Sequence, residues 1–156
     1  MIYSFLLLIL VSGMSASGCV TIDRVGYLRV ADSRVTLLSG KGELILRSPE
    51  LIEELRNLDG ARVDVVGTVS GRRVRVVGYR LLDPGNGMQP YVGQLTIGQL
   101  DVSVYDIALG RRYTLARPLP VSIFELHGAK VWITGEVVGT DLIRVADFGI
   151  IRPPEP

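Results

Sequence analysis

The chain has 156 residues, of which 17 are Lys or Arg and 16 are Asp or Glu, so its formal net charge is +1. This near balance excludes a global electrostatic attraction for nucleic acid, and the single cysteine excludes a disulfide within the chain. Eighteen glycines and many valines favour strands joined by tight turns.

An apolar run near the start of the chain is followed by small residues. Residues 5–11 are all apolar, and residues 12–18 are all small except Met14. This layout is typical of a secretory signal peptide, and the run is too short for a membrane span, which needs about 20 apolar residues. We therefore expect residues 1–18 to be a signal peptide and the chain to be exported.

The only cysteine, Cys19, follows directly in the segment Ala16-Ser17-Gly18-Cys19, which resembles the bacterial lipobox. The resemblance implies a lipoprotein in which Cys19 is the first mature residue and carries acyl chains such as palmitate, which anchor it in a membrane. Two features depart from the pattern: Ala16 stands where Leu is preferred, and no Lys or Arg precedes the apolar run. The alternative is an ordinary signal peptide cut after Gly18, which leaves a reactive unpaired thiol.

The residues after Cys19 bear on where the anchored chain lies. The residue after the cysteine is Val20 and not an aspartate. In Gram-negative species this resembles the pattern that sorts a lipoprotein to the outer membrane, with the protein on the periplasmic face. Residues 20–25 extend about 20 Å. We expect residues 19–25 to be a tether that keeps the first folded unit close to the lipid headgroups.

Two segments of the chain repeat each other. Residues 58–71 read LDGARVDVVGTVSG, and residues 126–139 read LHGAKVWITGEVVG, an offset of 68. The similarity extends in both directions, so the chain contains two copies of one unit of about 65 residues. We expect repeat 1 at 26–82, a linker rich in turn formers at 83–90, repeat 2 at 91–152 and a Pro-rich tail at 153–156.

Alternating apolar residues predict five strands in repeat 1, at 27–31, 34–38, 43–47, 61–69 and 73–82. Between the third and fourth strands lies SPELIEELRNLDG, in which Ser48 can cap a helix and Gly60 can end it. The counterpart in repeat 2, PLPVSIFELHG, is shorter and predicts one or two helical turns.

This order of strands and helix, with the motif L-x-G-x-x-V-x-[VI]-x-G-x-V, resembles the OB-fold. The resemblance covers nearly all of residues 26–152. It implies a mostly β fold of two tandem small OB-like β-barrels, each with one short helix between strands 3 and 4. It implies no particular activity, because the fold hosts many unrelated functions.

The chain contains one histidine, His127, and no recognisable catalytic motif. Repeat 1 has Asp59 at the equivalent position, so a polar residue that ends a helix explains both better than a catalytic or metal-binding role. The adjacent Glu53 and Glu54 diverge around the helix, and we expect them on a solvated face. We expect no enzyme, no metal and no cofactor, with a hydrolase that uses an unrecognised site as an alternative.

Arg72, Arg73 and Arg75 cluster at the hairpin between the fourth and fifth strands, and Arg80 follows. In OB-folds a loop at this place flanks the ligand face. We consider two interpretations: a binding site for an anionic saccharide or lipid headgroup, and a charged hairpin that keeps a strand edge soluble.

Trp132, the only tryptophan, lies between Val131 and Ile133, which align with Val63 and Val65. If these aliphatic residues fill the two barrels, Trp132 faces out of its own barrel. An outward indole usually covers something, and we expect it at an interface with the other barrel or with a partner.

The sequence thus predicts a lipid-anchored bacterial envelope lipoprotein that acts as a non-enzymatic binding or scaffolding module at the membrane surface. The anticipated partners are the membrane, through the lipid, and an envelope protein, but not nucleic acid. The alternative function is a ligand-binding barrel for an anionic saccharide or lipid headgroup near Arg72 and Arg73.

Overall fold

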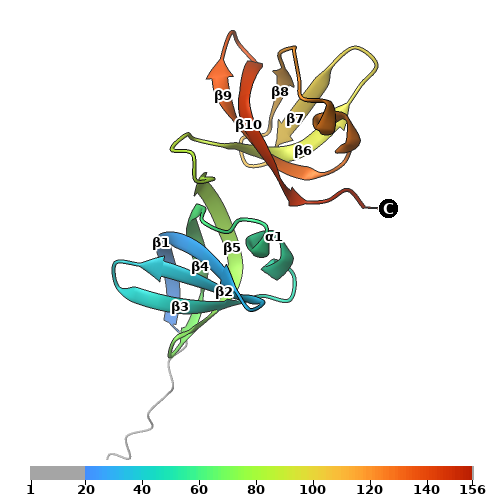
Figure 1. Cartoon of the computed structure of the whole chain (residues 1–156). Coiled ribbons are helices and arrows are strands. Elements are labelled where there is room, and N and C mark those ends of the chain that lie inside the picture. The colour runs from blue at the N-terminus through green and yellow to red at the C-terminus, as the bar shows by residue number, and fades with distance from the viewer. Residues whose placement is uncertain (1–19, 156) are drawn as a thin grey trace, which may run out of the picture.

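The computed structural model describes residues 20–155 (Figure 1). Within these residues the chain forms ten strands and one short α-helix, which confirms the expectation of a mostly β fold. The strands are arranged in two five-stranded sheets. The predicted signal peptide at 1–18 and Cys19 lie outside the described residues.

The first sheet is a closed barrel of mixed strand direction. Its neighbouring strands are antiparallel except for β3 and β5, which pair in parallel between residues 45–47 and 73–75. The spatial order is β1-β2-β3-β5-β4, and β4 pairs back onto β1. The elements are β1 (Val20–Ala31), β2 (Arg34–Ser39), β3 (Gly42–Arg47), α1 (Ile52–Arg56), β4 (Arg62–Ser70) and β5 (Arg73–Asp83).

The second sheet closes into a ring with the same order, β6-β7-β8-β10-β9, and its parallel pair is β8 and β10. A 3-10 helix takes the place that α1 has in the first barrel, so the shorter helical segment expected in repeat 2 is observed. The elements are β6 (Tyr91–Ile97), β7 (Val102–Asp106), β8 (Arg111–Leu115), the 3-10 helix (Val121–Glu125), β9 (Lys130–Val137) and β10 (Leu142–Arg152).

β1 starts earlier than the alternation pattern indicates, which corrects the expected tether. Residues 20–27 run antiparallel to residues 69–62 of β4 without a break in register, and this pairing satisfies their backbone N–H and C=O groups. The sequence pattern is weak here because apolar side chains point outward, with Val20 60% and Val25 40% exposed. Residues 20–25 are therefore part of the first barrel.

Side chains alternate between the interior of each sheet and its outer face. Val63 and Val65 are fully buried in the first core, and Val131 and Ile133 are buried in the second. The prediction that these residues fill the two interiors is confirmed.

The glycine of the repeated motif is required where two strands approach closely. A Cβ added at Gly67 would lie 2.4 Å from the carbonyl oxygen of Arg75, and one at Gly135 would lie 2.0 Å from that of Arg144. Both glycines lie next to irregularities in the pairing with the following strand. The motif G-x-V is thus repeated because the same tight contact occurs in each sheet.

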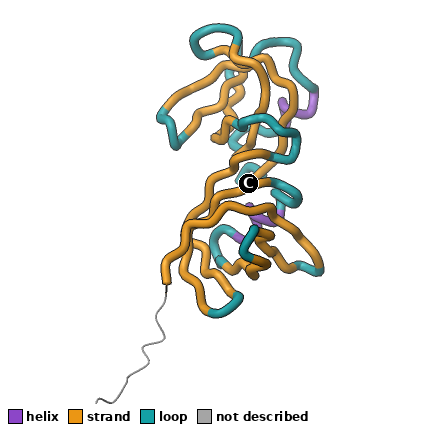
Figure 2. Tube along the Cα trace, turned by 90° about the vertical axis from the view of Figure 1, so that its left-hand side faces the viewer, coloured by secondary structure: helices purple, strands orange, loops and turns teal. Residues whose placement is uncertain are grey.

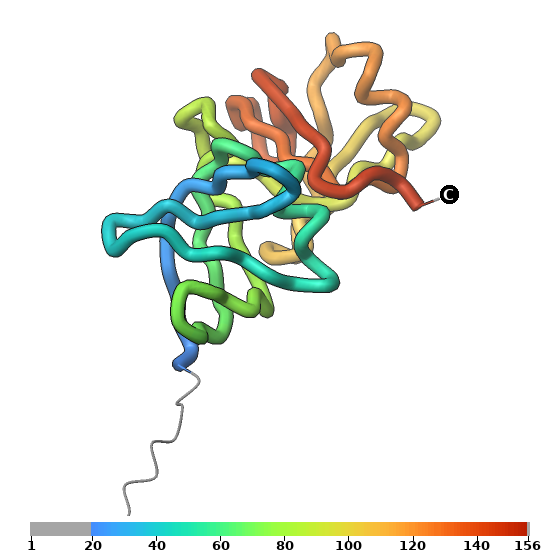
Figure 3. The backbone as a smooth tube through the Cα atoms, turned by 60° about the horizontal axis from the view of Figure 1, so that its bottom comes forward, coloured from blue at the N-terminus to red at the C-terminus, as the bar shows by residue number. Residues whose placement is uncertain are grey.

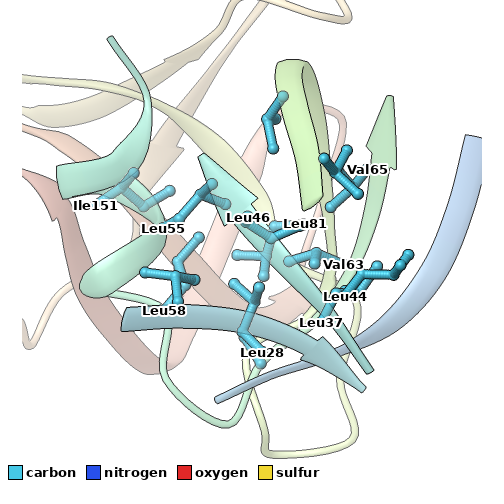
Figure 4. Close-up of a cluster of buried hydrophobic side chains, with 14 residues drawn as sticks. Leu28, Leu37, Leu44, Leu46, Leu55, Leu58, Val63, Val65, Leu81 and Ile151 are labelled. Atoms are coloured by element: carbon cyan, nitrogen blue, oxygen red, sulfur yellow. The ribbon is translucent and has the colours of Figure 1, made fainter. Parts of the chain in front are cut away.

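The two sheets form two lobes that meet at a waist, and the C-terminal residues lie at that waist (Figures 1 and 2). Ile151, at the end of β10, is fully buried in the core of the first barrel. Figure 4 shows it beside Leu55 of α1. Val92 and Trp132 of the second sheet also pack against the first core, so the second sheet completes the interior of the first barrel.

We predict that Ile151→Ala lowers the free energy of unfolding by about 3 kcal/mol, because it leaves a cavity in the first core. The matched control is Ile150→Ala at the neighbouring position, where the side chain is 39% exposed and the loss should be below about 1 kcal/mol. Urea unfolding followed by Trp132 fluorescence measures both. Equal losses in the two variants would contradict the assignment of Ile151 to the first core.

Candidate functional site

The outer face of the first barrel carries a group of exposed arginines, which we call the basic face. Strand alternation produces it: inward residues such as Leu28, Val35, Leu46 and Val74 belong to the core, so the arginines beside them point outward. The basic face consists of Arg29 on β1, Arg34 on β2, Arg47 on β3, and Arg73 and Arg75 on β5.

The sheet topology brings these arginines together. β1, β2, β3 and β5 are consecutive neighbours in the barrel. The parallel register places Arg47 opposite Arg75 and Ile45 opposite Arg73. Residues far apart in the sequence therefore lie on adjacent strands of one curved surface, which Figure 3 shows from the end at which β1 begins.

The five side chains of the basic face lack acidic partners within the described part of the chain. No carboxylate oxygen of residues 20–155 lies within 4.0 Å of their charged nitrogens. Arg72 lies at the adjoining hairpin, 3.9 Å from Glu43, and Arg80 pairs with Asp64 at 3.1 Å. Unpaired guanidinium groups are well suited to carboxylate and phosphate ligands, which they bind through two parallel hydrogen bonds.

The second sheet has no counterpart of this surface. The pairing of β8 with β10 places Leu142 where the first barrel has Arg73, and Arg144 where it has Arg75. Arg144 is bonded to Glu136 at 2.8 Å. A shared fold thus carries two different surfaces, and the basic face belongs to the first barrel.

The structure separates the three arginines singled out in the sequence. Arg73 and Arg75 belong to the basic face, whereas Arg72 lies at the hairpin beside Glu43. Arg29, Arg34 and Arg47 were missed because they are scattered in the sequence. Their outward direction follows from alternation, but their proximity to Arg73 and Arg75 depends on the parallel pairing of β3 with β5.

His127 has a structural role that Asp59 reproduces in the first barrel. The N–H of Ile97 donates to His127 Nδ1 at 3.0 Å, and the N–H of Val30 donates to Asp59 Oδ1 at 2.7 Å. Acceptance at Nδ1 places the proton of a neutral imidazole on Nε2. Each residue thus binds the backbone of the first strand of its own sheet.

Glu54 of α1 is the centre of a polar cluster at the waist. It was expected on a solvated face, but its side chain is only 5% exposed. Its Oε2 accepts hydrogen bonds from Lys130 Nζ and from the Tyr79 hydroxyl, both at 2.6 Å. Arg152 lies 3.6 Å from Oε1. The α-helical period alone could not predict the burial of Glu54, because its three partners, Tyr79, Lys130 and Arg152, lie on β5, β9 and β10.

The environment of Glu54 sets its protonation state. Burial by itself would raise the pKa of Glu54, but the hydrogen bonds from Lys130 and Tyr79 and the charges of Lys130 and Arg152 outweigh it, so the pKa is lowered. Burial and the neighbouring Glu54 carboxylate raise the pKa of Tyr79 far above its usual range. The cluster is therefore a carboxylate held by a neutral phenol and two cations.

Trp132 is partly buried and packs against the core of the first barrel. It faces out of its own sheet. Lys130, two residues earlier on the same face of β9, is the residue that donates to Glu54. A hydrogen bond from Asn57 Nδ2 to the carbonyl oxygen of Ile151, at 3.0 Å, adds a further link between the two sheets.

Among residues 20–155, no group of three or more His, Cys, Asp or Glu side chains is placed to hold a metal ion. No helix in this part of the chain combines the length and the apolar character that crossing a membrane requires.

Comparison with protein-family models, with curated proteins and with solved structures finds no match to this chain.

We predict that Glu54→Gln lowers the free energy of unfolding by about 3 kcal/mol at neutral pH, because Lys130 loses its buried partner. The matched control is Glu53→Gln on the same helix, where the side chain is 74% exposed and the loss should be below about 1 kcal/mol.

The same variants give a pH dependence. The lowered pKa of Glu54 contributes stability that is fully present above the ordinary value of 4.5 and is lost as the pH falls through the pKa of the folded state. The stability difference between the wild type and Glu54→Gln should therefore shrink in acid. A difference that stays constant between pH 7 and pH 3 would show that the charge of Glu54 does not stabilise the joint.

Proposed function

We propose that this chain is an exported, lipid-anchored bacterial envelope protein that acts as a non-enzymatic binding or scaffolding module at a membrane surface. Its two units are OB-like. The strand order β1-β2-β3-β5-β4, the parallel β3–β5 pair and the helix between β3 and β4 support this assignment for the first unit. The second unit has the same order of elements, with a 3-10 helix.

The segment Ala16-Ser17-Gly18-Cys19 carries the proposal of an anchor, and the position of Val20, the residue after Cys19, indicates where on the first barrel an anchor would be attached. Val20 is paired with Val69 near the end of β4. The next residue, Ser70, is opposite Arg73 at the β4–β5 hairpin. Adjacent Cα atoms are about 3.8 Å apart. An acyl group on Cys19 thus inserts beside the hairpin that carries Arg72 and Arg73.

The arrangement gives the two units different positions relative to the membrane. The first barrel, which is held at its β4–β5 hairpin, rests on the headgroups. The second sheet lies at the opposite end of the molecule from the start of β1 (Figure 1) and extends away from the bilayer. Contacts with a protein partner therefore fall to the second sheet or to the sides of the molecule.

A second candidate function uses the anchor end itself: recognition of anionic lipid headgroups by Arg72 and Arg73. Both arginines are exposed, and Lys41 lies in the neighbouring β2–β3 turn. Cations near an anionic surface contribute about 1 kcal/mol each. The alternative ligand, an anionic saccharide, would bind the same arginines in the absence of a bilayer.

We predict that cells expressing the protein incorporate radiolabelled palmitate into it, and that Cys19→Ala abolishes both the label and membrane retention. The physical reason is that the thioether needs the sulfur of Cys19 and that acyl chains supply the hydrophobic anchor. Retention of Cys19→Ala on membranes with no label in either form would refute the anchor. The stability of the purified variant, measured by urea unfolding, shows whether it still folds.

We predict that Arg72→Ala/Arg73→Ala weakens binding of the Cys19→Ala form to phosphatidylglycerol vesicles by about 2 kcal/mol, or roughly 30-fold. Binding should also weaken as salt is raised. The matched control is Arg111→Ala/Arg144→Ala, which removes the same charge from residues paired with Asp141 and Glu136. Equal binding by both double variants would discard headgroup recognition. Direct binding of soluble polygalacturonate, in the absence of vesicle binding, would favour the saccharide.

A further inference from the structure

A hollow on the first barrel lies beside the β1–β2 turn, at the end of β1 opposite to Val20. Its volume is about 500 Å³, and its walls are the turn residues 32–34, the end of β3 at 45–47, the loop 48–49, and Ile52 and Arg56 of α1. A second hollow of about 230 Å³ shares Asp32 and Arg34 with it. A volume of this size accommodates a small organic ligand.

The charges around the larger hollow favour a doubly charged anion. Three arginines, Arg34, Arg47 and Arg56, and one carboxylate, Asp32, line it. Because Arg56 is already paired with Glu53, Arg34 and Arg47 are the two cations open to a ligand. Arg34 and Arg47 belong to the basic face and have no acidic partner among residues 20–155. A phosphate monoester carries about −1.5 to −2 charges at pH 7, whereas a carboxylate carries one.

The third arginine is fixed in place. Arg56 Nη2 donates to the carbonyl oxygen of Ser33 at 3.0 Å, and Nη1 is paired with Glu53. Its Nε is buried and has no hydrogen-bond partner in the described part of the chain. A guanidinium held at two points loses little conformational entropy when an anion binds.

The β1–β2 turn positions one wall of the hollow. Asp32 and Ser33 are the two loop residues between the paired Ala31 and Arg34, and their positive φ angles, +49° and +62°, are those of a type I′ hairpin turn. This conformation aims the carbonyl of Ser33 at Arg56.

The second sheet provides an internal comparison. In the first barrel Val35 is opposite Leu46, and in the second sheet Ser103 is opposite Thr114, so Val102 and Leu115 are the equivalent pair. Asp101 therefore stands at the place of Arg34, and Ala116 at the place of Arg47. Two of the three cations of the hollow, Arg34 and Arg47, are thus absent from the second copy while the fold is kept.

The hollow lies beside the strand that carries the hairpin arginines. The N–H of Ile45, which lines the hollow, donates to the carbonyl oxygen of Arg72 at 2.8 Å, and Ile45 is opposite Arg73. If the anchor is at Cys19, as the proposed function holds, the hollow is therefore near the headgroups, and the charge of the phosphate group distinguishes a soluble ligand from a lipid.

We propose that this hollow is a binding site for a small soluble phosphate monoester, with Arg34 and Arg47 as the ligands of the phosphate and Arg56 as a fixed third cation. A soluble monoester is favoured over a phosphodiester lipid headgroup such as phosphatidylglycerol, whose phosphate carries a single charge. Arg73 lies on the neighbouring strand, opposite Ile45 of the hollow.

Isothermal calorimetry of the full-length protein in detergent micelles tests the site with glucose 6-phosphate as the probe. We expect saturable binding that weakens about tenfold in Arg34→Ala and about tenfold in Arg47→Ala, since each variant removes one charge-assisted contact. Arg47→Ala installs the residue that the second sheet has at this place, so the fold should be preserved. Arg111→Ala/Arg144→Ala, which removes two arginines of the second sheet, should bind glucose 6-phosphate as the wild type does.

Three results would overturn the proposal. These are an absence of binding to glucose 6-phosphate, binding that is unchanged in Arg34→Ala and Arg47→Ala, and equally strong binding of glucose, which is uncharged, or of glucuronate, which carries a single negative charge. Binding to phosphatidylglycerol micelles alone would reassign the site to lipid. Because the calorimetry does not depend on Cys19, loss of the palmitate label leaves this test intact, and failure of this test leaves the anchor intact.

Discussion

Three residue pairs between β3 and β5 close the first barrel, and the features of its surface depend on them. The pairing joins residues 45–47 to 73–75 in parallel, so it brings together segments that are separated by a helix and a whole strand. Without it Arg47 and Arg75 would lie on open edges. With it, β1, β2, β3 and β5 form one continuous wall that concentrates five cations and forms one side of the hollow near α1.

The two copies show how one frame supports different surfaces. The two copies share their strand order and their tight glycine contacts. Each also has a polar residue at the same place, Asp59 or His127, that binds the backbone of its first strand. The exteriors have diverged. The first barrel carries the unpaired arginines, whereas the second unit exposes large apolar side chains in its loops (Leu100, Ile107 and Leu109) and at the start of its 3-10 helix (Val121). Interior packing restricts sequence in both copies, and the outer faces are free to differ.

The joint at the waist makes the two sheets interdependent. Ile151 and Trp132 supply apolar surface to the first core, and Glu54 sets the polar contacts through Lys130 and Arg152. α1 contributes to both features, since Glu54 and Leu55 face the joint while Ile52 and Arg56 line the hollow. A five-residue helix thus lies between the proposed ligand site and the second sheet.

Local periodicity in the sequence predicted many of the strands and their inward faces. The alternation around Val63 and Val131 identified strands and their inward faces. Ser48 was expected to cap the helix; its Oγ accepts a hydrogen bond from the N–H of Leu51 at 3.1 Å in the preceding turn, but α1 begins at Ile52 with Leu51 at the N-cap. These features depend on neighbours within a few residues, which the sequence displays directly.

Only the tertiary structure decided the remainder. The start of β1 at Val20 follows from pairing with β4, the burial of Glu54 follows from Lys130, which is 76 residues away, and the insertion of Ile151 follows from contact with the other sheet. The composition of the basic face likewise follows from strand order. In each case the partner residue is distant in the chain. A pattern of neighbouring residues therefore cannot predict the contact, because the stabilisation depends on a residue outside that pattern.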